Sequence, residues 1–264
     1  MWDPAQYHRY SDERSRPFVE LLARVAATSP RYVADLGCGP GNLTAALALR
    51  WPGADVEGVD SSAEMLASAQ EVLAEYQSRG AAGGGSLTFR QADVRDFEPS
   101  RGADVIVCNA VLQWIGCHRD LLPRWAGFLT EGGWLAFQVP GNYSEPSHQI
   151  LRELARSDRW RDALAGVEMT RQTYDPADYL ELLTGAGCDV DAWETTYLHV
   201  LAGEDPVLDW YMGSGLRPVI AALDPDQAAA FAGEYASRLR VAYPARSYGT
   251  VLPFRRVFVV ARRN

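Results

Sequence analysis

Short apolar runs alternate with amphipathic segments through the first half of the chain. Apolar runs that stop at turn residues predict five strands, at 31–36, 54–59, 87–91, 103–108 and 132–139. Apolar residues that recur every three or four positions predict helices at 12–28, 42–51, 62–79 and 118–129. The nearly continuous run at 103–108 is typical of a central strand buried on both faces. This alternation predicts a mainly parallel sheet with helices on both faces.

The second half of the chain departs from this simple alternation. A helix at 176–186 and strands at 190–201 and 252–261 complete an expected doubly wound α/β sheet of about seven strands, the last one antiparallel. Two insertions, at about 141–174 and 203–248, each follow a strand; the second contains helical runs at 210–223 and 226–242. Open α/β sheets bind ligands at the carboxyl ends of their strands, so we interpret both as helical cap insertions on the acceptor side. The alternative is that the two insertions have only a structural role and do not contribute to the site.

Length and composition indicate one enlarged globular domain over residues 1–264. The hydrophobic fraction of 47% and the charged fraction of 22% are ordinary for such a domain. No apolar run approaches the roughly 20 residues that span a bilayer, and the N-terminus shows no secretory signal. The four cysteines have irregular spacing, which favours a reduced, cytoplasmic setting without a structural metal.

The charged residues narrow the class of partner. The net charge of -9 argues against nucleic acid and anionic membranes as main partners. We therefore expect a small-molecule substrate and a monomer or weak homodimer. All 25 basic residues are arginine, which excludes Schiff-base chemistry and a Walker-type phosphate lysine. Guanidinium groups are planar and permanently charged, so they suit the binding of carboxylates.

A glycine-rich loop follows the first predicted strand and opens a helix. Its sequence is Asp35-Leu36-Gly37-Cys38-Gly39-Pro40-Gly41. A dinucleotide fingerprint would place its third glycine at position 42, where this chain has asparagine. The pattern Asp-x-Gly-x-Gly-x-Gly instead resembles the first motif of Rossmann-like (class I) methyltransferases. That resemblance implies contacts from Asp35, Gly37, Gly39 and Gly41 to the methionine and ribose portions of S-adenosylmethionine.

Further acids stand at the ends of the next strands. A carboxylate at Asp60 can accept two hydrogen bonds from ribose hydroxyls, and Asp93 suits an adenine amino group. For each acid alone, the alternative is a helix cap or turn residue. The other residues expected to contact the cofactor are Ser61, Met65, Val94 and Asn109.

The segment after the fourth strand bears on the acceptor. Amide and amine methyltransferases often carry an Asn/Asp-Pro-Pro-aromatic run there, and this chain has Asn109-Ala110-Val111-Leu112-Gln113-Trp114. The absence of the Asn/Asp-Pro-Pro-aromatic run argues that the methyl acceptor is an oxygen or a carbon atom.

Motifs along nearly the whole chain, in the same order, resemble the trans-aconitate 2-methyltransferase family. They are Trp2-Asp3-Pro4, Arg14-Ser15-Arg16-Pro17-Phe18, Leu112-Gln113-Trp114, Gln138-Val139-Pro140-Gly141-Asn142 with Pro146-Ser147-His148, Trp193-Glu194-Thr195-Thr196-Tyr197, Gly215-Leu216-Arg217-Pro218 and Phe254-Arg255-Arg256-Val257-Phe258. The glycine-rich loop at 80–86 is longer than this family leads us to expect.

The resemblance implies methyl transfer from S-adenosylmethionine to a carboxylate of a small polycarboxylic acid, with trans-aconitate favoured. The products are a methyl ester and S-adenosylhomocysteine. A carboxyl group with a pKa near 4 is already ionised at neutral pH, so no catalytic base is needed. We expect no catalytic residue beyond groups that position the acid and exclude water. The four histidines lack metal-ligand spacing, so we also expect no metal.

An acid with two or three carboxylates needs cations and hydrogen-bond donors close together. The candidates for the acceptor pocket are Arg217, Arg255 and Arg256, with Trp114, Tyr143, His148, His199 and Trp210 as walls or donors. Arg255 and Arg256 are neighbours on a strand, so only one of them can face the pocket. Arg14 is the candidate for the carboxylate of the cofactor's methionine portion. For each arginine, the alternative is a solvated surface position.

Three other functions remain as alternatives. A carboxyl methyltransferase that acts on a malonyl group of a carrier protein has a similar Leu-Gln-Trp segment, but it would need a basic patch that this sequence does not clearly show. A nicotinamide-dependent oxidoreductase would need the third glycine at position 42. A non-catalytic S-adenosylmethionine-binding protein would bind the cofactor without turnover.

Overall fold

A computed structural model of the chain describes residues 11–78, 80, 83–169 and 173–264. The motif Trp2-Asp3-Pro4, His8 and parts of the predicted loop at 80–86 and of the insertion at 141–174 lie outside the described residues. The chain divides into two compact units. Unit 1 comprises 1–14, 140–171 and 195–256, and unit 2 comprises 15–139, 172–194 and 257–264. The prediction of one domain with two insertions stays a prediction.

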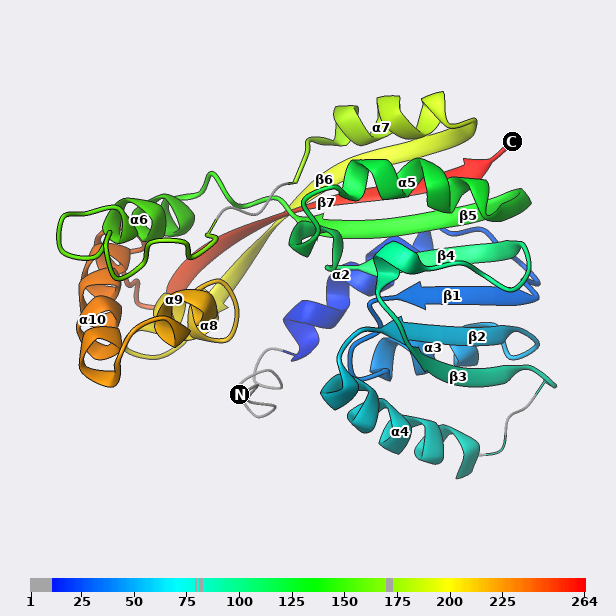
Figure 1. Ribbon diagram of the computed structural model, residues 1–264, viewed down its shortest axis with the longest axis horizontal. Coiled ribbons are helices and arrows are strands. Elements are labelled where there is room, and N and C mark those ends of the chain that lie inside the picture. Colours follow the sequence, from blue (N-terminus) through cyan, green and yellow to red (C-terminus); the bar gives the residue numbers. More distant parts are fainter. Residues whose placement is uncertain (1–10, 79, 81–82, 170–172) are drawn as a thin grey trace. The chain divides into compact units, whose positions relative to one another are not determined.

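A seven-stranded sheet in the order β3-β2-β1-β4-β5-β7-β6 is built on unit 2 (Figure 1). The strands are β1 (Tyr32–Leu36), β2 (Asp55–Asp60), β3 (Ser86–Gln91), β4 (Ala103–Asn109), β5 (Leu129–Pro140), β6 (Cys188–Leu201) and β7 (Thr250–Arg263). Strands β1 to β5 pair in parallel. Figure 1 shows β7 running opposite to β1. The prediction of a mostly parallel, seven-stranded α/β sheet is confirmed.

The strand order fixes where a ligand can bind. The chain moves outward from β1 to β3 and then returns to β4 on the other side of β1. Right-handed crossovers place the connections of the two halves on opposite faces of the sheet. Helices α3 (Asn42–Arg50) and α4 (Ala63–Ser78) pack on β2 and β3, whereas α5 (His118–Gly127) packs with α7 (Pro176–Gly185). The switch between β1 and β4 is where doubly wound sheets bind ligands.

The core of unit 2 holds the ends of β1 and β4 in place. All five residues of β1 are buried, and so are Val105 to Cys108 of β4. Trp125 of α5 and Tyr179 of α7 are completely buried in the same cluster. His118 is satisfied within this core, because Nδ1 lies 2.9 Å from the Ile115 carbonyl and Nε2 lies 2.9 Å from the Tyr179 hydroxyl. His118 is therefore a structural residue of this core.

Unit 1 has a separate core built mainly from helices. They are α6 (Pro146–Ala155), α8 (Pro206–Met212), α9 (Arg217–Ala221) and α10 (Pro225–Ala242), with the adjoining parts of β6 and β7. Trp160, Trp210 and Phe231 are buried in this core. Asp224 starts α10, and its carboxylate accepts a hydrogen bond from the Gln227 amide at 2.8 Å in a capping box. Within the described ranges, no helix is both long enough and apolar enough to cross a membrane.

Several predicted boundaries were wrong. Helix α2 (Ser11–Ala23) ends before the predicted residue 28, and the Val25 amide closes a tight turn on the Leu22 carbonyl at 3.0 Å. The predicted helical run at 210–223 is two short helices, α8 and α9, because Gly213 ends the first. Strand β5 begins at Leu129 and includes a register irregularity, with Gly132 at φ +72°.

Candidate functional site

The glycine loop joins the carboxyl end of β1 to the N-terminus of α3. Gly37, Gly39 and Gly41 have φ values of +77°, +55° and +84°, a region that glycine adopts with little strain. The amides of Gly37 and Cys38 donate to the Val59 carbonyl at 2.7 and 3.1 Å. These bonds fasten the loop to the end of β2, which leaves the first turn of α3 facing the sheet edge with its unpaired N–H groups.

Asp35 is the first residue of the motif and is 2% exposed. Its carboxylate accepts a hydrogen bond of 2.6 Å from the Thr44 hydroxyl on α3. Burial, opposed by the Thr44 hydrogen bond and helped by the negative charge of Asp60, raises the pKa of the Asp35 carboxyl to about 6. The hydrogen bond between Asp35 and Thr44 therefore links β1 to α3 beneath the glycine loop. Because the Asp35 carboxyl is buried, its ionisation lowers the stability of the fold.

This raised pKa gives a testable pH dependence of stability. The folded state holds the Asp35 proton more tightly than the unfolded state, so the stabilisation is complete below the unfolded pKa, near 4, and is lost as the pH rises through about 6. Without cofactor, the wild type should lose about 1.5 kcal/mol of unfolding free energy between pH 5 and pH 8 relative to Asp35→Asn. Urea unfolding at both pH values measures this difference.

Asp55 offers the matched control for that experiment. Hydrogen bonds from Ser86 and Arg101 hold its pKa below the usual value, so Asp55 is ionised in both the folded and the unfolded state at pH 5 and at pH 8, and Asp55→Asn should leave the difference in stability between these two pH values unchanged. Parallel stability curves for the wild type and Asp35→Asn would contradict the assignment.

Asp60 stands at the end of β2, beside the loop. One carboxylate oxygen accepts from the Gly39 amide and the other from the Ser62 amide, both at 2.9 Å. A carboxylate has about four acceptor positions, so each oxygen can accept one more hydrogen bond. These backbone bonds fix the carboxylate at the sheet edge, and the predicted binding of a pair of ribose hydroxyls at the remaining positions stays a prediction.

The space around the three glycines tests whether the loop fits a cofactor. A Cβ at Gly37 would lie 2.2 Å from a methyl carbon of Val111, and one at Gly41 would lie 2.6 Å from the Phe89 ring. These glycines are therefore needed for packing inside the protein. A Cβ at Gly39 would meet no atom of the described residues within 4 Å. The middle of the loop therefore presents bare backbone to open space beside the Asp60 carboxylate, which fits close approach of a ribose and methionine portion.

Asp93 has the helix-cap role that the sequence left open as the alternative to adenine binding. It precedes the short helix η1 (Val94–Asp96), and its carboxylate accepts from the Arg95 amide at 2.8 Å and from the Arg95 guanidinium at 2.6 and 3.0 Å. These hydrogen bonds hold the pKa of the Asp93 carboxyl below its usual value. The side chain of Val94 is buried in the main core, so a cofactor contact there would come from its backbone. Binding of adenine by this pair stays a prediction.

The start of α4 carries the other adenine-side candidates. Ser61 is exposed, and its carbonyl accepts from the Gln91 amide group at 3.2 Å. Met65 is half-buried, and its backbone amide donates to the Ser62 hydroxyl at 3.2 Å. The next residue, Leu66, packs in a small buried cluster with Cys38 and Ala69. The predicted contact of Met65 with adenine stays a prediction.

The segment after β4 faces the same edge. Asn109 ends β4, and its side-chain oxygen accepts from the Gln138 amide group at 2.6 Å. Ala110 has φ +57°, the one non-glycine residue with positive φ among those described. This turn places Val111 against Gly37 and leads into helix η2 (Leu112–Trp114), where Trp114 is 51% exposed. A strained non-glycine residue at such an edge is typical of a functional site.

The predicted acceptor residues other than Trp114 belong to unit 1. Tyr143, His148 and Tyr211 form edge-to-face ring contacts, with centroids 4.9 and 5.1 Å from that of His148. His199 stacks on the buried Trp210 at 4.8 Å. Unit 1 therefore brings the predicted aromatic residues together in two groups, one around His148 and one around Trp210.

The predicted arginines have different surroundings. Arg217 is half-buried at the first position of α9. Arg255 donates to the Gly141 carbonyl at 3.1 Å. Arg256 is 7% exposed, and its guanidinium lies 4.9 Å from the centre of the Phe254 ring. The side chain of Arg14 lies outside the described residues, although its backbone belongs to α2.

Three residues that support the site were not predicted from the sequence. They are Thr44, Ala110 and Gln138, which respectively hold Asp35, turn the chain after β4 and orient Asn109. Only Thr44 left a signal, as the one hydroxyl in the otherwise apolar middle of its helix. The other two act through backbone geometry and strand pairing, which a single sequence does not display.

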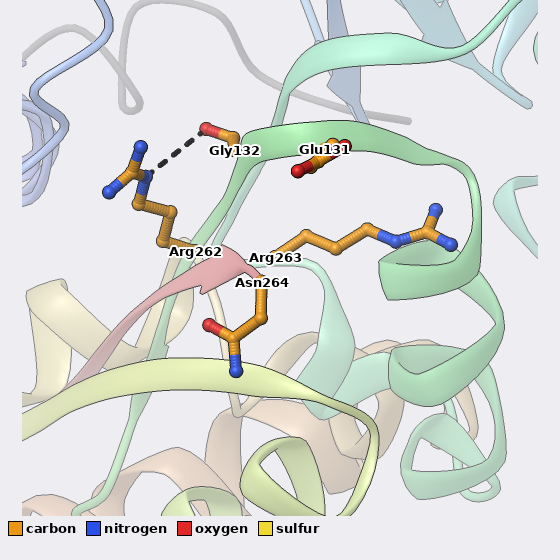
Figure 2. Close-up of a pocket in the computed structure, with 5 residues that line it drawn as sticks. All are labelled: Glu131, Gly132, Arg262, Arg263 and Asn264. Carbon is orange, nitrogen blue, oxygen red and sulfur yellow. Dashed lines mark hydrogen bonds between the residues drawn. The ribbon is translucent and has the colours of Figure 1, made fainter.

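A pocket of about 460 Å³ lies at the other edge of the sheet (Figure 2). Its lining residues come from the amino end of β5 and the carboxyl end of β7: Glu131, Gly132, Arg262, Arg263 and Asn264. Figure 2 shows the side chains of Arg262 and Arg263 pointing in opposite directions. Since the two cations diverge and the glycine loop lies at the opposite strand ends, we do not assign this pocket to the active site.

Comparison with known proteins agrees with this geometry. Residues 33–133 match the family described as "Methyltransferase domain". The trans-aconitate 2-methyltransferase of Streptomyces avermitilis is 54% identical over 266 residues, which cover 100% of this chain and 97% of that protein. The protein of the same name from Rhodococcus jostii is 52% identical and covers 99% of both chains.

Solved structures support the fold. The YcgJ protein of Bacillus subtilis has a TM-score of 0.59 at 12% identity, over 94% of this chain and 98% of its own. A Haemonchus contortus phosphoethanolamine N-methyltransferase bound to S-adenosylhomocysteine has a TM-score of 0.56 at 16% identity, over 94% of this chain and 53% of its own. Full-length identity near 50% to named relatives shows the family. The chain is an S-adenosylmethionine-dependent methyltransferase and belongs to the trans-aconitate 2-methyltransferase family.

Proposed function

We propose that this enzyme methylates a carboxylate of trans-aconitate and forms a methyl ester. The similarity to trans-aconitate 2-methyltransferases over the full length, unit 1 included, is the observation that carries this proposal. Unit 1 holds the predicted acceptor residues, so a similarity confined to the methyltransferase domain would have said little about the acceptor. A carrier-protein substrate has no comparable support.

On the cofactor side, the chain supplies binding and orientation. S-adenosylmethionine supplies an electrophilic methyl group on a sulfonium cation. We assign the ribose hydroxyls to Asp60, the adenine to Asp93, Val94 and Met65, and the methionine portion to the loop residues and Arg14. Gly39 permits close approach because none of the residues that the structure describes fills the space beside it. Ser61 and Asn109 complete the proposed contacts.

On the acceptor side, the chain positions an acid that is already ionised. Because a carboxylate is a competent nucleophile at neutral pH, we assign no catalytic base, and no metal is required by the proposal. Arginine side chains suit the remaining carboxylates of the acid through paired charge-assisted hydrogen bonds. An anion and a cation lose charge together in the transition state, so exclusion of water by the aromatic residues favours the reaction. The enzyme is proposed to work in the cytosol.

Turnover on a panel of acids tests this function. Labelled S-adenosylmethionine is incubated with trans-aconitate, cis-aconitate, citrate and a malonyl-carrier protein, and the ester is identified by mass spectrometry. We expect the largest kcat/KM for trans-aconitate. Preferred turnover of the carrier protein would replace the proposal by its alternative.

The arginines are tested in the same assay. Removal of Arg217 or Arg255 should raise the KM for the acid by about tenfold or more, because a charge-assisted hydrogen bond contributes about 1.5–3 kcal/mol. The dissociation constant of S-adenosylmethionine should change much less. Equal effects on both ligands would show that the acceptor pocket has been misplaced.

A further inference from the structure

His148 is a buried histidine of unit 1 that the packing alone does not explain. It lies in the first turn of α6, is 8% exposed, and is held between the rings of Tyr143 and Tyr211. Burial, together with the positive charge of Arg152, lowers the pKa of His148 to about 4. The imidazole is therefore neutral at physiological pH, with one nitrogen that donates and one that accepts.

The surroundings of Nδ1 decide which nitrogen carries the proton. Two hydroxyls, those of Ser147 and Tyr211, each lie 3.5 Å from Nδ1. The Tyr211 oxygen already accepts from the Ser147 hydroxyl at 2.8 Å and from the Asn142 amide group at 3.1 Å. Its own proton is therefore directed to Nδ1. This arrangement makes Nδ1 the acceptor and leaves the ring proton on Nε2.

Space lies beside Nε2 because residue 215 has no side chain. A Cβ at Gly215 would lie 3.9 Å from Nε2 and 3.4 Å from the nearest atom of the Tyr211 ring, which are ordinary contact distances. Gly215 is also absent from the glycines with positive φ. Alanine would therefore fit the fold at this position without strain. Among the described residues, we find none that accepts a hydrogen bond from Nε2.

We infer that His148 donates from Nε2 to a carboxylate oxygen of the acceptor acid, in the space that Gly215 leaves beside it. This inference rests on the proposed function, and it names the donor and the glycine that shape the acid's subsite. A neutral N–H suits the task, because it fixes the oxygen without cancelling the charge that makes the acid nucleophilic. Ser147, Tyr211 and Asn142 are positioning residues that keep the proton on Nε2.

Two substitutions of similar size test the donor. The side-chain nitrogen of glutamine can stand near the Nε2 position, whereas that of asparagine stands near Nδ1. His148→Asn should raise the KM for trans-aconitate about tenfold or more, and His148→Gln should recover most of that loss, while both leave the dissociation constant of S-adenosylmethionine unchanged. An unchanged KM, or equal loss in both variants, overturns the inference.

Gly215→Ala tests the space. We expect an unchanged melting temperature and cofactor affinity, with a KM for the acid raised about tenfold. Gly233→Ala is the matched control: Gly233 lies in α10, no described residue comes within 4 Å of its Cβ position, and the substitution should leave the KM unchanged. An unchanged KM in Gly215→Ala overturns the inference.

Nitrogen–proton NMR correlation of the histidine rings reads the proton position without any acceptor, and the signal of His148 is assigned by its loss in His148→Gln. A proton on Nε2 is expected, and Tyr211→Phe should shift the ring toward the other tautomer; a proton on Nδ1 in the wild type overturns the inference. If the wild type methylates a different acid, the proposed function fails by itself, and the same variants are then compared on that acid.

Discussion

Asp60→Ala should weaken the binding of S-adenosylmethionine by at least about a hundredfold, as measured by isothermal titration calorimetry. The carboxylate is proposed to accept two hydrogen bonds from the ribose, and each hydrogen bond to a charged group contributes about 1.5–3 kcal/mol. The substitution also removes the acceptor of the Gly39 and Ser62 amides, so the loop loses the contacts that fix its middle. The effect on affinity should therefore exceed that of the ribose contacts alone.

The same strand offers the control. Asp55 begins β2 as Asp60 ends it, so it lies at the other edge of the sheet, where it pairs with Arg101. Asp55→Ala should leave the affinity for S-adenosylmethionine unchanged. Asp60→Asn, which keeps one acceptor oxygen, should fall between the wild type and Asp60→Ala. An Asp60→Ala variant that binds the cofactor normally would remove Asp60 from the site.

The sheet could be predicted because its signals are local. The continuous apolar run of β4 and the glycine loop after β1 each depend only on neighbouring residues, and they mark a central strand and a crossover. Element ends were less predictable. The run at 210–223 was predicted as helical, yet it breaks into α8 and α9 at Gly213-Ser214-Gly215, a local signal of poor helix formers that the prediction did not use.

The sequence names individual candidates for the cofactor side, which stay predictions, but it does not show the contacts that support them. Asp60 is recognisable because it ends a strand next to the loop. Its bond to the Gly39 amide, however, joins residues 21 positions apart and depends on the register of β1 and β2. The acceptor side needed a family resemblance, because aromatic and arginine residues spread over 143–256 carry no spacing signal of their own.

The three loop glycines also differ in a way that the sequence motif hides. At Gly37 and Gly41 the protein itself fills the space of a side chain, whereas at Gly39 that space is open. The motif therefore places glycine at these positions for two physical reasons, internal packing and the proposed approach of a ligand. Substitution of Gly41 and of Gly39, one at a time, can separate the effect on internal packing from the effect on ligand binding.

Gly41→Ala should destabilise the fold, whereas Gly39→Ala should mainly abolish cofactor binding. At Gly41, φ is +84° and the new Cβ would lie 2.6 Å from Phe89 and 3.0 Å from Ala69. Left-handed strain of about 1–2 kcal/mol and overpacking of about 1–3 kcal/mol together correspond to a melting temperature lower by roughly 10 °C.

At Gly39, the strain alone applies, which corresponds to a loss of only a few degrees. The added methyl group would, however, occupy the space proposed for the cofactor, so the affinity for S-adenosylmethionine should fall by about a hundredfold or more. Thermal unfolding without cofactor and titration calorimetry measure the two effects separately. Normal cofactor affinity in Gly39→Ala would mean that the open side of the loop faces solvent in the working enzyme, and the proposed seat of the ribose and methionine portion would then have to be abandoned.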